Sequence, residues 1–344
     1  MAVVSPPEQA STLAPASRSR GVPAVLAVLA PVVAAGVAYS VHAFVPDKQE
    51  ILLTWLTKLP DWQHPFVVLV AGVGAASILA ALLQSVWQPS RSWVRHYAPL
   101  MAGALFVLTF WDVITAKKDW LEQPYFPGPD EVFASLLEDR RILLDSAWHS
   151  LILLLSGYLA GVLMGVTTGV LIGWFPRVRY WGMPVLKIVG PIPATALIPL
   201  MMMISRHTYP CAVALIGFTV WFPVTMLTSS GIANVRLSYL DVARTLGAGR
   251  LYLIFRVAIP SALPNIFIGL FMGLGASFLT LIAAETLGVP SGLGSYLLWR
   301  KGAMEYAKVY ADLIVMALFF STLMTILFKL RDHVLKWQKG VIRW

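Results

Sequence analysis

Long apolar stretches are the feature of this sequence that most constrains its fold. Each is long enough for a helix to cross a hydrocarbon core about 30 Å thick. Several contain Pro or Gly, which transmembrane helices tolerate better than soluble ones do. The sequence therefore predicts an all-α integral membrane protein with eight transmembrane helices, at residues 22–44, 65–87, 98–114, 151–174, 183–204, 210–228, 262–287 and 310–330.

Composition agrees with a membrane bundle and argues against soluble classes. Hydrophobic residues make up 58% of the 344 residues and charged residues only 12%, whereas soluble domains carry roughly 25% charged residues. The formal net charge is +9, but the basic residues lie in short loops between apolar stretches, so we expect no nucleic-acid partner. Cys211 is the single cysteine, which excludes an intramolecular disulfide.

The N-terminal region has features of its own. Residues 1–21 are rich in Ser, Pro and Ala, which predicts a disordered cytoplasmic tail. The first apolar stretch, 22–44, predicts a membrane helix, although Val41 and Ala43 also form a weak signal-peptide cleavage pattern. The length of the stretch favours the membrane helix, and cleavage stays open as the alternative.

Basic residues predict the orientation in the membrane. Cytoplasmic loops carry an excess of Lys and Arg, and this asymmetry places both termini in the cytoplasm. On the opposite side, residues 130–144 have an apolar stripe that predicts an amphipathic surface helix or an ordinary loop helix. The basic residues on the expected cytoplasmic side are Arg18, Arg20, Arg91, Arg95, Arg177, Arg179, Arg236, Arg244, Arg250, Arg256, Arg331, Lys336, Lys339 and Arg343.

The chain lacks the residue patterns of common enzymes. It contains no G-x-x-x-x-G-K-[ST] loop for nucleotide phosphates, no H-E-x-x-H, no G-x-S-x-G and no Cys/His cluster. We therefore expect no catalytic residue, no cofactor and no metal site in this chain.

The loop 229–260 carries the most informative pattern, S-Y-L-D-V-A-R-T-L-G-A-G-R-L-Y-L-I-F-R-V-A-I-P. Ser238 and Asp241 have capping-box spacing, which starts a helix. Gly247 can adopt the left-handed conformation that ends it. A second helix is expected to rise from Arg250 towards Pro260 and the next membrane span. The sequence thus predicts a helical hairpin that projects from the membrane.

This loop resembles the EAA signature of binding-protein-dependent ABC importer permeases, which reads E-A-A, three residues, Gly, nine residues, then I-x-L-P. Here Asp replaces Glu, Val replaces the first Ala, and Val and Ile replace the two aliphatic residues. The following S-A-L-P-N-I-F-I-G-L and A-E-T-L-G-V-P-S-G-L-G are similar to the nitrate, sulfonate, taurine and bicarbonate branch. The resemblance covers residues from about 125 to the C-terminus, and the matching signature positions are Asp241, Val242, Ala243, Gly247, Val257, Ile259 and Pro260.

The resemblance implies a type I permease core of six helices at 97–344, to which the two helices of 22–96 are additional. It implies that the loop 229–260 contacts separate ATP-binding cassette subunits, which bind ATP and Mg²⁺. It also implies a periplasmic or extracellular substrate-binding protein, a second permease copy in a homodimer, and a place in the bacterial inner membrane. The residues implied in coupling are Asp241, Ala243, Arg244, Gly247 and Pro260.

The substrate implied by the resemblance is a small anion such as nitrate, bicarbonate or an organosulfonate. The alternative is a secondary transporter driven by an ion gradient. Such transporters show internal repeats and an ion site at the membrane midplane, and neither is evident here.

Glycines recur every four residues along the span 151–174. They place a bare stripe on one helix face, where another backbone can come close. We expect this stripe to serve helix packing, with a moving seam between pathway helices as the alternative. The glycines are Gly157, Gly161, Gly165, Gly169 and Gly173.

Four prolines interrupt the span 183–204, so it cannot be one regular helix. Irregular backbone at membrane depth is tolerated where it is buried in protein or lines a cavity. Ionisable residues in or near spans are functional candidates, with snorkelling or local pairing as the alternative. The resemblance implies that residues 291–294 cap the outer mouth, and a plain turn is the alternative. The expected pathway residues are Lys187, Pro191, Pro193, Thr280 and Glu285.

Overall fold

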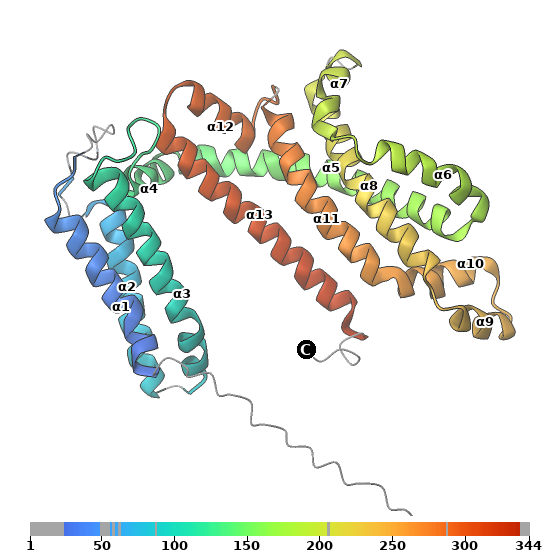
Figure 1. The fold of residues 1–344 in the computed structure, drawn as a ribbon, viewed down its shortest axis with the longest axis horizontal. Coiled ribbons are helices and arrows are strands. Elements are labelled where there is room, and N and C mark those ends of the chain that lie inside the picture. Colours follow the sequence, from blue (N-terminus) through green and yellow to red (C-terminus); the bar gives the residue numbers. More distant parts are fainter. Residues whose placement is uncertain are drawn as a thin grey trace, which may run out of the picture. The chain divides into compact units, whose positions relative to one another are not determined.

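In the computed structural model, every element of regular secondary structure in the described part of the chain is a helix (Figure 1). The predicted all-α fold is therefore confirmed, while the predicted tail 1–21 lies outside the described residues. The described residues are 24–48, 56, 59–60, 63–86, 88–204, 207–286 and 288–337.

The chain divides into two compact units. Unit 1 comprises Met1–Leu121 and Gly128–Asp130, and unit 2 comprises Glu122–Pro127 and Glu131–Trp344. The helix α4 (Pro129–Glu138) begins in unit 1 and continues in unit 2.

Unit 1 is built from α1 (Ala24–Phe44), α2 (Pro65–Val86) and α3 (Gln88–Asp112), and one turn of π-helix, η3 (Val113–Lys117), continues α3. The helix α1 packs against both α2 and α3. The predicted span 98–114, which the resemblance places in the six-helix core, lies in this unit. Apolar side chains fill the contacts, among them Ala35, Ala38, Phe66, Val70 and Leu105, all buried.

Three long helices form the centre of unit 2: α5 (Arg140–Trp174), α8 (Thr208–Ala233) and α11 (Ile259–Glu285). The helix α8 packs along both α5 and α11, and α13 (Tyr306–Val334) contacts α5, α11 and the short α12 (Leu293–Gly302). The apolar core of the unit includes Leu154, Ile216, Phe267 and Leu281, which are buried at this meeting of helices.

Short elements connect the long helices of unit 2. Between α5 and α8 lie α6 (Pro176–Val189), η4 (Ala194–Leu197) and α7 (Ile198–Ile204). Between α8 and α11 lie α9 (Leu237–Thr245), α10 (Arg250–Tyr252) and the π-helical turn η5 (Leu253–Ala258).

The five glycines of α5 all face α8, at positions four residues apart. A methyl group added at any of them would lie within 2.8 Å of an atom of α8. This is far closer than carbon atoms normally approach, about 3.5–4.0 Å, so the two helices meet backbone to backbone. The facing residues of α8 are Ile216, Gly217, Val220, Val224, Thr228 and Ile232.

The helices α5 and α8 run in the same direction, because Gly157 meets Ile216 and Gly173 meets Ile232. Two parallel membrane helices start on the same side, so the chain between them must cross back. That connection contains α6 and the η4–α7 segment, which are bent by 82° relative to each other. The prediction that 183–204 is not one regular helix is confirmed.

The predicted number of transmembrane helices is only partly supported. Five helices in the described residues are long and apolar enough to cross a membrane, and the bent α6–α7 segment would be a sixth. Unit 1 contains one of the five, together with two shorter apolar helices, Leu29–Phe44 and Pro65–Ala80. The five long helices are His96–Lys117, Arg140–Trp174, Thr208–Ala233, Arg250–Glu285 and Tyr306–Val334.

The predicted surface helix over 130–144 is wrong in extent. The structure divides it at Asp139, where φ is −91° and ψ is 14°, so α4 ends at Glu138 and α5 begins at Arg140. Asp139 is held there by Tyr296 and Arg300, whose side chains donate to its carboxylate at 2.7 and 2.8 Å. A tertiary contact therefore breaks a helix that the apolar periodicity alone would continue.

Candidate functional site

The segment between α8 and α11 folds as a helical hairpin. The helix α9 does not begin as the capping-box spacing predicted, because Arg236 is its N-cap residue and no side chain caps it. Ser238 therefore lies inside the helix. The first turn is closed by the backbone instead, since the Tyr239 amide donates to the Arg236 carbonyl at 3.1 Å.

Gly247 ends α9 in the left-handed conformation, with a φ of 84°. The Ala248 amide donates to the Ala243 carbonyl at 3.0 Å, and the Gly247 amide donates to the Arg244 carbonyl at 2.9 Å. These two bonds are the Schellman pattern, which satisfies the last carbonyls of a helix. The stop that the sequence placed at Gly247 is confirmed, as is the start of the second helix at Arg250.

The hairpin is fixed to the membrane helices at two points. Leu240 is buried where α9 packs against η5. Pro260 has no backbone N–H to donate, and it lies just after the π-helical turn η5 within the continuous helix Arg250–Glu285. The orientation of α9 therefore follows from one apolar anchor and one left-handed glycine.

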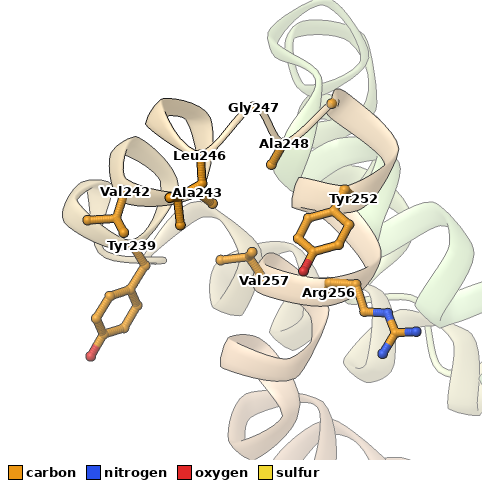
Figure 2. Close-up of a pocket in the computed structure, with 10 residues that line it drawn as sticks. Tyr239, Val242, Ala243, Leu246, Gly247, Ala248, Tyr252, Arg256 and Val257 are labelled. Carbon is orange, nitrogen blue, oxygen red and sulfur yellow. The ribbon is translucent and has the colours of Figure 1, made fainter.

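An apolar groove of about 630 Å³ lies between α9 and the α10–η5 segment. Figure 2 shows side chains of α9 on one side and those of residues 252–257 on the other. Leu246 is 83% exposed and Val242 is 60% exposed, which is unusual for apolar side chains in an arginine-rich segment. Exposed apolar surface of this kind marks a binding surface. The lining residues are Tyr239, Val242, Ala243, Leu246, Gly247, Ala248, Gly249, Tyr252, Arg256 and Val257.

Charged residues surround this groove. Asp241 and Arg244 form an ion pair of 3.0 Å in which both side chains are more than half exposed. Exposed pairs of this type contribute only about 0.2–1 kcal/mol, so both charges remain available to another surface. A second, polar pocket of about 910 Å³ lies beside α9 and is lined in part by Arg177, Arg179, Arg244 and Arg250.

The expected pathway residues fall into two groups that the structure does not bring together. Lys187, Pro191 and Pro193 are exposed at the end of α6 and in the bend that follows it. Thr280 and Glu285 are buried on α11. The Thr280 hydroxyl lies 3.0 Å from that of Thr219 on α8.

Glu285 holds the start of α12 against α5. Its carboxylate accepts the Ser150 hydroxyl at 2.5 Å and the Gly294 amide at 2.7 Å. The Ser150 oxygen in turn accepts the Leu293 amide at 2.9 Å. The segment 291–294, a sequence candidate for the outer mouth, is therefore tied to two long helices through one carboxylate.

Some buried polar residues were missed by the sequence reasoning. Asp312 of α13 is fully buried, and neither of its carboxylate oxygens has a hydrogen-bond partner among the described residues. An acidic residue inside an apolar span was the signal that could have found it. The group of Asp139, Tyr296 and Arg300 had no such signal, because its members are far apart in sequence. Burial and the hydrogen bond to Asp139 raise the pKa of the Tyr296 hydroxyl.

Comparison with known proteins gives the family. Residues 157–339, which lie in unit 2, match the binding-protein-dependent transport system inner membrane component family. The chain is 32% identical over 205 residues to the taurine transport system permease protein TauC of Escherichia coli, covering 57% of this chain and 74% of the relative.

Two further relatives have related descriptions. The chain is 30% identical to the putative aliphatic sulfonates transport permease protein SsuC of Bacillus subtilis, over 54% of this chain and 67% of the relative. It is 31% identical to the nitrate import permease protein NrtB of Leptolyngbya laminosa, over 41% of this chain and 50% of the relative. The family match covers more than half of the chain. This chain therefore belongs to the binding-protein-dependent transport system inner membrane components, the non-catalytic, multi-pass permease subunits of ABC importers.

Proposed function

We propose that two copies of this chain pair as a homodimer and form the substrate pathway of an ATP-driven importer. ATP-binding cassette subunits, which bind ATP and Mg²⁺, dock on the groove of α9 from the cytoplasm. A substrate-binding protein delivers substrate on the opposite side, and both chain termini face the cytoplasm.

The groove of α9 is the observation that carries this proposal. Its apolar side chains are exposed and lie outside the apolar spans, where lipid does not cover them. A docked protein that buries one Leu or Val gains about 1.5–3 kcal/mol of binding free energy. The small side chain of Ala243 lets a partner come close to α9. The ion pair of the exposed Asp241 and Arg244 can open, so that each side chain forms an ion pair with a docked subunit instead.

The exposed face of α6 and α7 supports a second copy. Trp181 is 76% exposed and Met203 is 87% exposed in the single chain. Backbone N–H and C=O groups that lack helical hydrogen bonds at membrane depth need protein or water as hydrogen-bond partners. The bend at Pro191 and Pro193 contains such groups. A second copy against this face would cover the bend and put Lys187 beside a shared pathway.

The burial of Thr280 and Glu285 favours a different role for them. Both lie inside the bundle rather than on the α6–α7 face. We therefore assign them to positioning α8, α11 and α12 around the pathway instead of direct contact with substrate.

Relatives support an anionic substrate. The names of those described above contain taurine, aliphatic sulfonates and nitrate, which share a small oxyanion group. We infer that this chain also passes a small oxyanion such as nitrate, bicarbonate or an organosulfonate. The alternative, a secondary transporter, would need no ATP-binding subunit.

Uptake into vesicles tests the proposal. The chain is reconstituted with and without its ATP-binding and substrate-binding partners, and uptake of labelled nitrate, bicarbonate and taurine is measured with ATP and with ionophores. We expect uptake of one of them that requires ATP and both partners and survives ionophores. Uptake that persists without ATP and stops with ionophores would establish the secondary transporter instead.

The groove is tested by Leu246→Glu, which places a charge among its apolar side chains. We expect recovery of the ATP-binding subunit during purification to fall at least tenfold, because about 1.4 kcal/mol of lost affinity has that effect. The matched control is Leu298→Glu, at a half-exposed apolar residue of α12. Unchanged recovery with Leu246→Glu would show that the groove is not the docking surface.

A further inference from the structure

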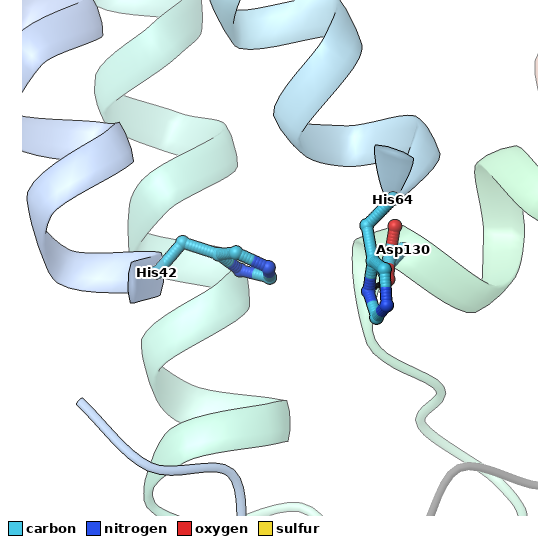
Figure 3. A group of neighbouring side chains, drawn as sticks. All are labelled: His42, His64 and Asp130. Carbon is cyan, nitrogen blue, oxygen red and sulfur yellow. Dashed lines mark hydrogen bonds and ion pairs between the residues drawn. The ribbon is translucent and has the colours of Figure 1, made fainter. Parts of the chain in front are cut away.

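Unit 1 contains a buried cluster of histidines and carboxylates that the permease family match does not include. His42 lies near the end of α1, and His64 directly precedes α2. Asp112 is the last residue of α3, and Asp130 lies in the first turn of α4. Figure 3 shows the ring of His42 pointing towards His64 and Asp130. Residues far apart in sequence therefore meet at the ends of four helices.

The cluster is closely spaced. Ligand atoms of His42, His64 and Asp130 all lie within 4.8 Å of one another. Atoms bound to one zinc ion at about 2.0–2.2 Å are at most about 4.4 Å apart. A small rotation of these side chains therefore brings all three onto one ion.

Each histidine is oriented by a carboxylate. His64 Nδ1 lies 2.6 Å from Asp130, and His42 Nδ1 lies 3.3 Å from Asp112. Asp130 is itself fixed, because its other oxygen accepts the Phe66 amide at 3.0 Å. The contact of Asp112 with His42 is the arrangement usual around protein-bound metals, in which a carboxylate outside the ligand set orients a ligating imidazole. His64 and Asp130 are neighbours within the proposed ligand set.

Asp112 supplies a second, independent observation. Its side chain is 1% exposed, and its Oδ1 has no hydrogen-bond partner among the described residues. An unsatisfied buried acceptor costs about 1–3 kcal/mol, and more when it is charged. A cation in the cluster would offset the cost of this buried negative charge.

The charge and space of the cluster suit a divalent ion. Asp47, Asp112 and Asp130 carry three negative charges, and Lys117, 2.7 Å from Asp47, carries one positive charge. With neutral imidazoles, the formal charge is minus two. Both histidines line a cavity of about 190 Å³, whereas one water molecule takes about 30 Å³.

We propose that His42, His64 and Asp130 bind a divalent transition-metal ion, and that Asp112 balances its charge. Mixed imidazole and carboxylate ligands are those of Zn²⁺, whereas Ca²⁺ and Mg²⁺ take oxygen ligands. The ion joins the ends of α1, α2 and α3 to the start of α4. The sequence predicted no metal site, because these residues have no recognisable spacing. The site does not depend on the transport function proposed above.

The test uses the full chain purified with a histidine-free tag, stripped with a chelator and dialysed against Zn²⁺ or Mg²⁺. The variant His42→Asn/His64→Asn removes both imidazoles but keeps an amide N–H near each Nδ1 position, so the contacts to Asp112 and Asp130 can persist. The matched control is His149→Asn, at an exposed histidine whose Nδ1 lies 3.4 Å from Asp145.

We expect about one tightly bound Zn²⁺ per chain in the natural protein and in His149→Asn, and no bound Mg²⁺. The double variant should bind Zn²⁺ at least tenfold more weakly, as loss of even an outer ligand has an effect of about 10–100-fold. Co²⁺ in place of Zn²⁺ should give visible absorption that the double variant lacks, while both variants elute as the natural protein does. No bound Zn²⁺ in the natural protein, or equal binding in the double variant, would overturn the proposal.

Discussion

At the scale of single residues, the hairpin contains two glycines with different requirements. Gly247 has a φ of 84°, while Gly249 has a φ of −74°. No described atom lies within 4 Å of a methyl group built at either position. The two positions therefore differ in backbone conformation but not in available space, which makes them a matched pair.

Gly247→Val should disrupt the hairpin, because a residue other than glycine in the left-handed region costs about 1–3 kcal/mol, and a β-branched one costs the most. Gly249→Val should be tolerated. We expect Gly247→Val to insert in the membrane but to lose the ATP-binding subunit and ATP-driven uptake, measured by co-purification and by vesicle transport. Equal subunit recovery and equal uptake in the two variants would show that the left-handed turn is not needed for coupling.

Glu285 gives a second prediction at this scale. Glu285→Leu leaves the Ser150 hydroxyl and the Gly294 amide without their buried acceptor, at about 1–3 kcal/mol for each group. Glu285→Gln keeps one acceptor oxygen and should cost less. Thermal unfolding and proteolysis within 288–303 should show the natural protein as the most stable, Glu285→Gln as less stable and Glu285→Leu as the least stable. A Leu variant as stable as the Gln variant would contradict this positioning role.

At the scale of elements, the close contact between α5 and α8 depends on glycines, which have no side chain to separate the two helices. The methyl group of an alanine at Gly165 would lie 2.8 Å from the Val224 side chain and 3.1 Å from the Trp221 carbonyl. The carbonyl is backbone and cannot rotate away. A larger side chain must therefore separate the helices.

Gly165→Leu should destabilise the bundle by at least about 1–3 kcal/mol, the usual cost of overpacking. Its matched control is Gly275→Leu on α11, because no described atom lies within 4 Å of a methyl group built there. Thermal unfolding and size-exclusion profiles should show loss of folded protein for the first variant and little change for the second. A stable, monodisperse Gly165→Leu protein would mean that α5 can move away from α8.

Local patterns predicted the elements but not their tertiary connections. Apolar length located the membrane helices, and Gly247 located the end of α9, since both effects act within a few residues. The break at Asp139 and the start of α9 at Leu237 were missed because contacts or backbone geometry decided them. The cluster of His42 and His64 could not be predicted, since only the fold brings its members together.

At the scale of the whole molecule, the direction of the helices supports the proposed topology. The parallel course of α5 and α8 requires a crossing between them, and α11 runs antiparallel to α8, as Gly269 meets Val224 and Gly273 meets Val220. Residues 234–258 and 288–305 therefore lie at opposite ends of α11, which the proposed topology puts on opposite sides of the membrane. In the proposed topology the first of these segments, the basic hairpin, lies in the cytoplasm.

Single cysteines test this topology in a Cys211→Ser background, since Cys211 is the single natural cysteine. An impermeant maleimide applied to spheroplasts, in which the inner membrane is accessible but sealed, should label Lys118→Cys and Lys301→Cys. It should label Arg179→Cys and Arg250→Cys only after the membrane is opened. Labelling of Arg250→Cys and Lys301→Cys from the same side would contradict the arrangement.

The seam between α5 and α8 has one more consequence, which concerns register. Glycines on α5 and β-branched residues on α8 both repeat every four residues. A slide by one repeat, about 6 Å at 1.5 Å per residue, would bring equivalent surfaces together, so apolar packing alone does not select one alignment. The Thr168 hydroxyl selects the observed alignment, because it lies 2.8 Å from the Thr225 hydroxyl and accepts the Trp221 indole N–H at 3.0 Å. The residues one repeat away on α5, Met164 and Ile172, carry no hydroxyl, so any slide breaks both bonds.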